Sequence, residues 1–210
     1  MIYKRILVIS PHTDDGELGA GGAIARFIEE GREVYFLVFS SCAKSIPEGT
    51  DPSVIKEECR LATQTLGIPP DRLFMLDYEV RTFPEHRQEI LKDLIIFKQK
   101  IQPDMVLVTS SNDTHQDHMT IYWETLRAFK KTASIFGYEH PWNNLTFTTD
   151  IFIKLKEQHL AKKLEALNNY KSQSDKNYFN EEYLRSLALT RGLNVDWQYA
   201  EAFELIRMVM

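Results

Sequence analysis

The 210-residue sequence has only two cysteines, Cys42 and Cys59, and no apolar stretch close to the roughly 20 residues of a membrane-spanning helix. Two cysteines make no disulfide framework, and neither has a partner at the spacing of a metal site, so we expect reduced thiols. The apolar run near the N-terminus is too short for the apolar region of a signal peptide. These absences predict a soluble, cytoplasmic protein without an integral membrane segment.

Clustered positive charge is missing as well. The net charge is −5 at pH 7, and the lysines and arginines are scattered along the chain. Because proteins that bind nucleic acid gather such residues into a basic patch, the sequence argues against nucleic acid as a partner. The length suits one substantial core, and no repeat or linker divides the chain. We therefore expect residues 1–210 to form a single domain.

What the chain does contain is a regular alternation of apolar runs with amphipathic stretches. The expected strands are residues 3–10, 34–41, 73–76, 105–109 and 133–138, and the expected helices are 19–30, 53–66, 85–101 and 117–131. This order predicts a three-layer α/β/α, Rossmann-like fold with a mostly parallel sheet. Beyond Pro141 the regularity weakens, and we expect an edge strand within 146–155 and helices within 155–170 and 181–190.

Polar residues gather directly after the first expected strand. His12 and Asp15 lie three apart on the turn that leaves it, with Asp14 between them. Open α/β sheets bind ligands at the carboxyl ends of their strands, and zinc accepts imidazole nitrogen together with carboxylate oxygen. Adjacent aspartates cannot easily point the same way, so one could bind a metal while the other faces its water. The alternative is that an aspartate only caps the following helix.

The glycines that follow, at positions 16, 19, 21 and 22, do not indicate a dinucleotide site. Their order is Gly-x-x-Gly-x-Gly, whereas the dinucleotide fingerprint is Gly-x-Gly-x-x-Gly. Ser40 and Ser41 also stand at the end of the second strand, where an acidic residue would bind the ribose. We expect these glycines to permit a tight turn and close packing of the helix on the sheet.

A second polar cluster, His115-Gln116-Asp117-His118, follows the strand expected at 105–109. His115 and His118 share one face if a helix has begun there. One imidazole could complete a three-ligand metal site while the other acts on the reacting group, and Asp117 could orient a histidine. Histidines at this spacing are also common on surfaces, so the cluster is informative mainly because the first cluster accompanies it.

Residues 11–22 (PHTDDGELGAGG) resemble the signature of the LmbE-like, or PIG-L, family of zinc-dependent N-deacetylases, and residues 115–118 resemble its second metal motif. Two further segments, 136–144 and 199–203, are similar to a bacterial branch associated with polysaccharide and amino-sugar metabolism. The resemblance spans nearly the whole chain. It implies Zn²⁺ or another divalent cation as cofactor and an N-acetylated amino sugar of the N-acetylglucosamine type as substrate.

Carried over position by position, the resemblance gives each polar residue a role. It makes His12, Asp15 and His118 the metal ligands. It makes Asp14 the general base that acts on a metal-activated water. It also implies that His115, in its protonated form, assists at the tetrahedral intermediate. The resemblance thus divides the two clusters into residues that hold the ion and residues that carry out the reaction.

Contacts to the substrate follow less directly. Some family members place a tyrosine where this chain has Asp113, and many carry an arginine where it has Lys56. Tyr138, Trp142 and Tyr199 are candidates for a sugar-facing wall, because amphipathic rings suit the apolar faces of sugars, but packing in the core is the more common role for each. We take Lys56, Trp142 and Tyr199 as the candidate substrate contacts. Arg191, beside Gly192, could bind a phosphate or simply lie on the surface.

Two other functions stay open beside an N-deacetylase. The same scaffold could hydrolyse another amide or an ester, a phosphoester included, with the help of a metal ion. The chain could also be a non-catalytic module that binds metal or carbohydrate. Asp14 and His115 argue against the module, because binding alone needs no general base. We expect a zinc-dependent hydrolase that removes an N-acetyl group from an amino sugar, and the sequence leaves a homo-oligomer open.

Overall fold

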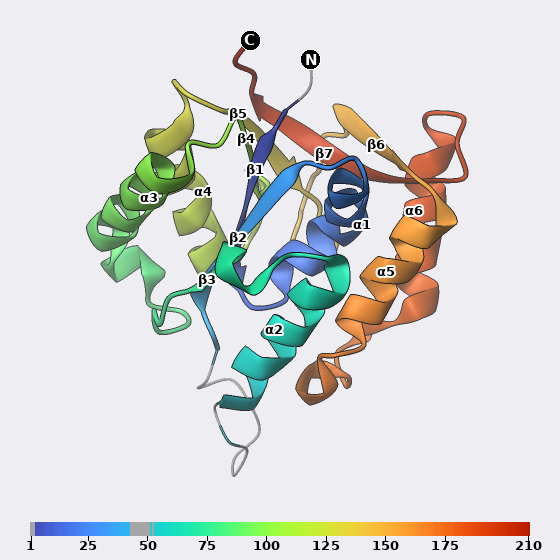
Figure 1. The fold of residues 1–210 in the computed structure, drawn as a ribbon, viewed down its shortest axis with the longest axis horizontal. Coiled ribbons are helices and arrows are strands. Elements are labelled where there is room, and N and C mark those ends of the chain that lie inside the picture. The colour runs from blue at the N-terminus through green and yellow to red at the C-terminus, as the bar shows by residue number, and fades with distance from the viewer. Residues whose placement is uncertain (1–2, 43–50, 52) are drawn as a thin grey trace.

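The computed structural model describes residues 3–42, 51 and 53–210 (Figure 1). Its seven strands join one sheet in the order β3-β2-β1-β4-β5-β7-β6. The strands are β1 (Arg5–His12), β2 (Glu33–Ser40), β3 (Leu73–Met75), β4 (Met105–Thr109), β5 (Ser134–Tyr138), β6 (Ile151–Leu155) and β7 (Tyr199–Arg207). Neighbours among the first five strands pair in parallel, and β7 is antiparallel to both of its neighbours. The predicted α/β fold with a mostly parallel sheet is confirmed.

Helices cover both faces of this sheet (Figure 1). One layer holds α3 (Arg87–Ile101) and α4 (Gln116–Phe129), and the other holds α1 (Asp15–Glu29), α2 (Ser53–Leu66), α5 (Glu157–Leu167) and α6 (Glu181–Leu193). Short 3-10 turns, η1 (Pro70–Arg72), η2 (Phe83–Glu85), η3 (Lys171–Gln173) and η4 (Asn177–Phe179), lie in the connections. No helix within the described ranges is long and apolar enough to cross a membrane.

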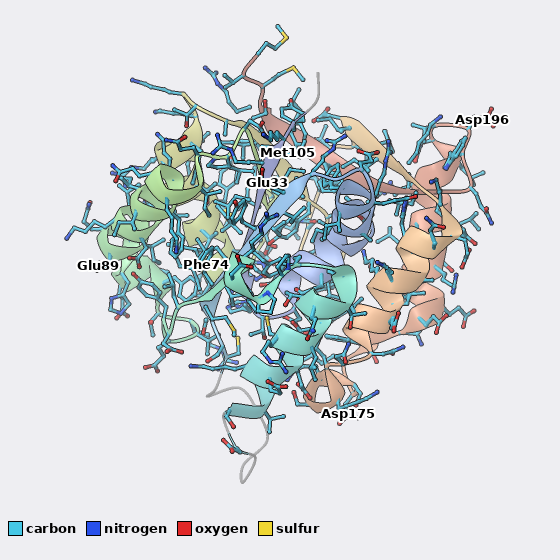
Figure 2. All side chains as sticks on the ribbon, in the orientation of Figure 1. Glu33, Phe74, Glu89, Met105, Asp175 and Asp196 are labelled. Carbon is cyan, nitrogen blue, oxygen red and sulfur yellow. The ribbon has the colours of Figure 1, made fainter. Side chains whose placement is uncertain are left out.

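The central strand β1 is buried on both faces. Ile6 and Val8 belong to the core beneath the α1 layer, whereas Leu7 and Ile9 belong to the core beneath α3 and α4. All four side chains are fully buried, and each such burial contributes about 1.5–3 kcal/mol. Side chains fill the space between the three layers, and charged residues such as Glu89 and Asp196 lie at the periphery (Figure 2). The strand ends are therefore where polar groups can gather without disturbing either core.

Helix α1 packs closely against β5 at Gly19. A Cβ at this position would come within 2.3 Å of the Tyr138 ring, nearer than non-bonded carbon atoms approach, so only glycine fits. Tyr138 is fully buried, and its hydroxyl donates a hydrogen bond to the carbonyl oxygen of Ile9 at 2.9 Å. The core-packing alternative therefore holds for Tyr138, and its role as a sugar-facing wall is wrong.

The structure differs from the sequence expectations mainly at the two ends of the chain. Strand β7, which was not predicted from the sequence, lies between β5 and β6. The alternation of apolar and polar residues in β7 is interrupted because the charged residue Glu201 is buried. Glu201 accepts hydrogen bonds from the backbone N–H groups of Gly22 and Ala23, and it pairs with Lys163. Near the N-terminus, β1 extends to residue 12 and α1 begins at residue 15. The first polar cluster thus spans a strand end and the first turn of a helix.

Candidate active site

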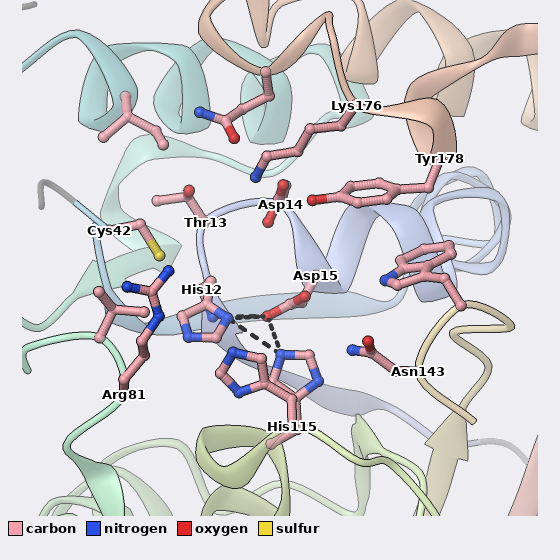
Figure 3. A pocket seen from close by; sticks show the side chains of 15 residues that line it. His12, Thr13, Asp14, Asp15, Cys42, Arg81, His115, Asn143, Lys176 and Tyr178 are labelled. Carbon is pink, nitrogen blue, oxygen red and sulfur yellow. Dashed lines mark hydrogen bonds and ion pairs between the residues drawn. The ribbon is translucent and has the colours of Figure 1, made fainter. Parts of the chain in front are cut away.

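The two polar clusters meet at the carboxyl ends of β1 and β4, which are neighbours in the middle of the sheet. From β1 the chain turns to β2 and β3 on one side and later enters β4 on the other, and such a switch point opens a crevice. His12 ends β1, and His115 is the N-cap residue of α4. All five residues of the predicted catalytic and metal set line one pocket: His12, Asp14, Asp15, His115 and His118 (Figure 3).

Three donor atoms converge in this pocket. His12 Nδ1 lies 3.0 Å from Asp15 Oδ2, His118 Nε2 lies 3.1 Å from the same oxygen, and the two nitrogens are 3.2 Å apart. Tetrahedral zinc with bonds near 2.0–2.2 Å separates its ligand atoms by roughly 3.3 Å, so this triangle has the size for one ion. Two overlapping sets, His12 with His115 and His118, and Asp15 with His118 and His140, are grouped closely enough to hold a metal. We favour the triangle because its three distances are all near 3 Å.

Two further carboxylates orient the histidines of the triangle. Asp117 Oδ2 lies 3.1 Å from His12 Nε2, and Asp113 Oδ2 lies 2.7 Å from His118 Nδ1. A carboxylate behind a histidine fixes its ring and leaves the other nitrogen free for a metal. Asp117 was expected in this role, whereas Asp113 was not. Asp113 also accepts a hydrogen bond from the backbone N–H of His115, and its sequence position resembles an ordinary helix start.

The charges around the triangle favour a positive charge at its centre. Burial lowers the pKa of His118, but Asp15 and Asp113 more than offset this and raise it to about 10. Burial raises the pKa of Asp15, but His118 and His12 bring it well below its usual range. The metal-free pocket therefore keeps a proton where a cation would be held. The donor set, its spacing and its charge all fit a divalent ion.

Asp14 occupies the N-cap position of α1, yet its side chain makes no capping hydrogen bond. Simple capping, the alternative function for this aspartate, is therefore wrong. Burial and the neighbouring charge of Asp15 raise the pKa of Asp14, while Lys176 opposes the shift. The result is a carboxylate that faces the pocket with an increased affinity for a proton.

His115 differs from His118 although both lie at the start of α4. Burial, together with the positive charges of His118 and His12, lowers the pKa of His115 to about 4. Its Nδ1 accepts a hydrogen bond from the backbone N–H of Asp117 at 3.1 Å, which places the ring proton on Nε2. The structure thus favours a neutral His115 over the protonated form expected from the sequence. The ring is neutral near pH 7 and offers one N–H donor.

His140 reaches the same centre from the loop after β5, a role that was not predicted from the sequence. Its Nε2 lies 3.0 Å from the backbone oxygen of Asp15, and its Nδ1 lies 3.8 Å from Asp113 Oδ2 and 4.0 Å from Asp15 Oδ1. Among the residues that the structure describes, no group is a hydrogen-bond partner of this buried Nδ1 atom. His140 thus packs against the first turn of α1, in a segment whose only sequence signal was its family resemblance.

Trp142 lines the pocket, as predicted, but its ring already stacks on two others. The ring centroids of Trp142 and His140 are 4.8 Å apart, and those of Trp142 and Tyr178 are 4.5 Å apart, with interplanar angles of 20° and 12°. Figure 3 shows the Tyr178 hydroxyl beside Asp14. Tyr178 therefore adds an aromatic ring to the pocket wall beside Asp14.

The other two predicted substrate contacts lie away from the described pocket lining. The Lys56 ammonium pairs with Asp77 at 2.6 Å on the exposed surface. Tyr199, at the start of β7, lines a separate hollow with residues of α6. Arg81 and Lys176 line the pocket instead. Both belong to loops without a motif, so no sequence pattern pointed to them.

Comparisons with known proteins extend the resemblance noted in the sequence. Residues 7–129 match the model of the PIG-L family, described as GlcNAc-PI de-N-acetylase. The chain is 32% identical over 175 residues to the uncharacterized deacetylase YaiS of Escherichia coli (strain K12), covering 80% of this chain and 91% of that one. It is 24% identical over 227 residues to the diacetylchitobiose deacetylase of Thermococcus kodakarensis, covering 97% and 83%.

The N,N'-diacetylchitobiose deacetylase of Pyrococcus horikoshii, solved with an inhibitor, superposes with a TM-score of 0.83 at 21% identity. The match covers 97% of this chain and 84% of that one, and it shows a shared fold. The family assignment itself rests on the match to residues 7–129 and on the likeness to YaiS along most of both chains. The chain belongs to the PIG-L, or LmbE-like, family and is a hydrolase of the N-deacetylase type.

Proposed function

We propose that this protein is a zinc-dependent hydrolase that removes the N-acetyl group from an N-acetylated amino sugar of the N-acetylglucosamine type. The observation that carries the proposal is the triangle of donor atoms with Asp14 beside it and free of any capping bond. The substrate class is supported by the relatives, two of which are named as deacetylases of diacetylchitobiose.

His12 Nδ1, Asp15 Oδ2 and His118 Nε2 would hold the ion. Zn²⁺ suits them because catalytic zinc sites use three such nitrogen and oxygen ligands and leave a fourth position open. When bound, the ion polarises the amide carbonyl and lowers the pKa of a water molecule from 15.7 toward about 7. Asp117 and Asp113 would keep the two imidazoles in place.

Asp14 would act as the general base. Its carboxylate accepts a proton from the attacking water while the water oxygen adds to the amide carbonyl carbon. The same carboxyl group then returns the proton to the nitrogen as the carbon–nitrogen bond breaks, so that acetate and the free amine leave. The raised pKa of Asp14 favours this exchange, because a base with a very low pKa would take the proton poorly.

His115 would stabilise the oxygen of the tetrahedral intermediate. Its Nδ1 is engaged by the backbone N–H of Asp117, so its Nε2–H is the donor available to the pocket. A neutral imidazole held in this way needs no reorganisation when negative charge develops on the oxygen.

Acetate release tests the proposal. The zinc-loaded protein is expected to release acetate from N-acetylglucosamine derivatives, to lose this activity with a chelator and to regain it with Zn²⁺. Activity that a chelator does not affect would contradict the proposal that the reaction depends on a metal ion. Release only from O-acetyl or other ester substrates would favour the alternative, a metal-dependent hydrolase of another amide or ester. A cytoplasmic location, the absence of a nucleic-acid partner and a homo-oligomer stay predictions.

A further inference from the structure

Two cationic side chains line the pocket beside the proposed catalytic groups. Arg81 comes from the loop between β3 and η2, and Lys176 from the loop between η3 and η4. Figure 3 shows the Lys176 ammonium reaching toward Asp14, and the Arg81 guanidinium beside Cys42 on the other side of the pocket. Within the described ranges neither cation forms an ion pair with a carboxylate. Both charges therefore act within the pocket, where that of Lys176 also lowers the pKa of Asp14.

The backbone of Arg81 is held firmly by a hydrogen bond to the site. Its φ of 71° lies in the left-handed region, which is costly for a residue with a Cβ and which glycine or asparagine adopts more easily. Its N–H donates a hydrogen bond to Asp117 Oδ2 at 2.6 Å, and the same oxygen lies 3.1 Å from His12 Nε2. Strained residues of this kind gather at functional sites. The loop thus presents an arginine at a position tied to a candidate metal ligand.

The chemistry of these two groups indicates the class of ligand. A guanidinium binds a phosphate or a carboxylate through two parallel hydrogen bonds, and an ammonium adds a point charge. Because the chain as a whole carries a charge of −5, an anion gains little from the overall field and depends on local cations. Arg191, the arginine that the sequence suggested for a phosphate, is instead paired with Glu139.

We propose that Arg81 and Lys176, one on each side of the pocket, attract an anionic group of the substrate, so that the protein prefers N-acetylated amino sugars that carry a phosphate or a carboxylate. The placement of this group beside the reacting amide rests on the proposed deacetylase function. The anion itself is recognised by the two cations and not by the metal ligands.

Steady-state kinetics on three substrates test the preference. The neutral substrate is the methyl glycoside of N-acetylglucosamine, and the anionic substrates are N-acetylglucosamine 1-phosphate and N-acetylmuramic acid, which distinguish phosphate from carboxylate. We expect kcat/KM to favour at least one anionic substrate by roughly tenfold, the scale of one charge-assisted hydrogen bond. Arg81→Gln should remove this advantage through KM, with a larger loss on the anionic substrate than on the neutral one. Lys176→Gln should reduce the same advantage.

Arg5→Gln is the matched control, because within the described ranges the Arg5 side chain also forms no ion pair, and Arg5 begins β1, whose other end is His12. It should keep the preference of the wild type. Equal kcat/KM for neutral and anionic substrates in the wild type would overturn the subsite while leaving the deacetylase function in place. An equal loss on all substrates in a folded Arg81→Gln protein would overturn it as well.

Calorimetric binding of the amine products separates the two proposals. Glucosamine 1-phosphate should bind the wild type roughly tenfold more tightly than the methyl glycoside of glucosamine, and Arg81→Gln should abolish this difference. If no substrate releases acetate but the difference is present and Arg81-dependent, the deacetylase function fails and the anion subsite stands. If the two amines bind alike, the subsite is overturned whatever the activity.

Discussion

The two sides of the pocket differ in how completely their polar groups are paired. We call one the paired side, made of His12, Asp15, His118, Asp113 and Asp117, and the other the open side, made of Asp14, His115, Arg81 and Lys176. On the paired side, both ring nitrogens of each histidine face a carboxylate oxygen. On the open side, the carboxylate makes no capping bond and the two cations have no carboxylate partner within the described ranges.

The paired side holds its donor atoms rigidly, whereas the open side leaves polar groups that a substrate can engage. Mutual hydrogen bonds hold donor atoms at fixed distances, which is what an ion of defined coordination requires. Groups without a partner give up that stabilisation, and they are the ones that a substrate can engage. Replacements on the paired side should therefore change metal affinity, and replacements on the open side should change turnover or substrate choice.

Asp14→Asn tests the open side and should have the largest effect. Loss of the general base is expected to lower kcat by roughly 10²–10⁴ while the zinc content stays that of the wild type. Metal analysis and acetate release measured on the same sample check this. Asp71→Asn, on an exposed turn, is the matched control and should leave both unchanged. A zinc-loaded Asp14→Asn protein with normal activity would contradict the assignment.

His115→Leu should lower kcat by roughly 10²–10³ with little change in metal content, because one donor to the developing oxyanion is lost. His115→Gln should recover part of the rate, since an amide N–H can replace the imidazole donor. Because the pKa of His115 is lowered to about 4, the wild-type pH–rate profile should have no limb from this residue between about pH 6 and 8. A limb in that range that disappears in His115→Gln would show that the histidine acts in its protonated form.

Asp113→Asn tests the paired side. The variant is expected to bind Zn²⁺ roughly 10–100-fold more weakly, because His118 loses the carboxylate that orients its ring. Competition with a chelator measures the affinity, and kcat at saturating metal should stay close to that of the wild type. Unchanged affinity with a reduced kcat would reverse the comparison and place Asp113 among the residues of the open side.

The stability of the metal-free protein should show the smallest effect. The folded protein holds the His118 proton with a pKa of about 10, above the ordinary 6.5, so its stabilisation is complete below about pH 6.5 and is lost as the pH rises toward 10. Between about pH 7 and 10 we expect Tm to fall by more than roughly 2–4 °C, the shift produced by 1 kcal/mol. His118→Gln should show a smaller fall in thermal melts. An equal fall in both proteins would exclude this contribution.

The sequence predicted the paired side better than the open side. His12, Asp15 and His118 lie in short motifs at strand ends, where local spacing and position in an α/β fold carry the information. Arg81 and Lys176 reach the pocket only through the course of two irregular loops, which no periodicity describes.

The wrong predictions about the fold have a similar cause. Strand β7 escaped prediction because its buried Glu201 satisfies backbone groups of α1, a tertiary contact that hides the alternation of the strand. Tyr199 and Lys56 were chosen by residue type and chain position, and the folded chain turns them toward α6 and Asp77. Residue chemistry predicted what the pocket needs, and three-dimensional packing decided which loops supply it.

Strands β1 and β4 are adjacent in the sheet but far apart in the chain, so the site is completed late during synthesis. His12 and His118 meet in space although they are 106 positions apart in the chain. A ribosome that adds roughly 5–20 residues per second makes His12 and Asp15, two of the three residues of the triangle, several seconds before His118. In a nascent chain, His12 and Asp15 therefore lack their third partner until α4 has been made. Tight binding of a metal ion by a nascent chain would then show that β1 and β4 have paired in the sheet.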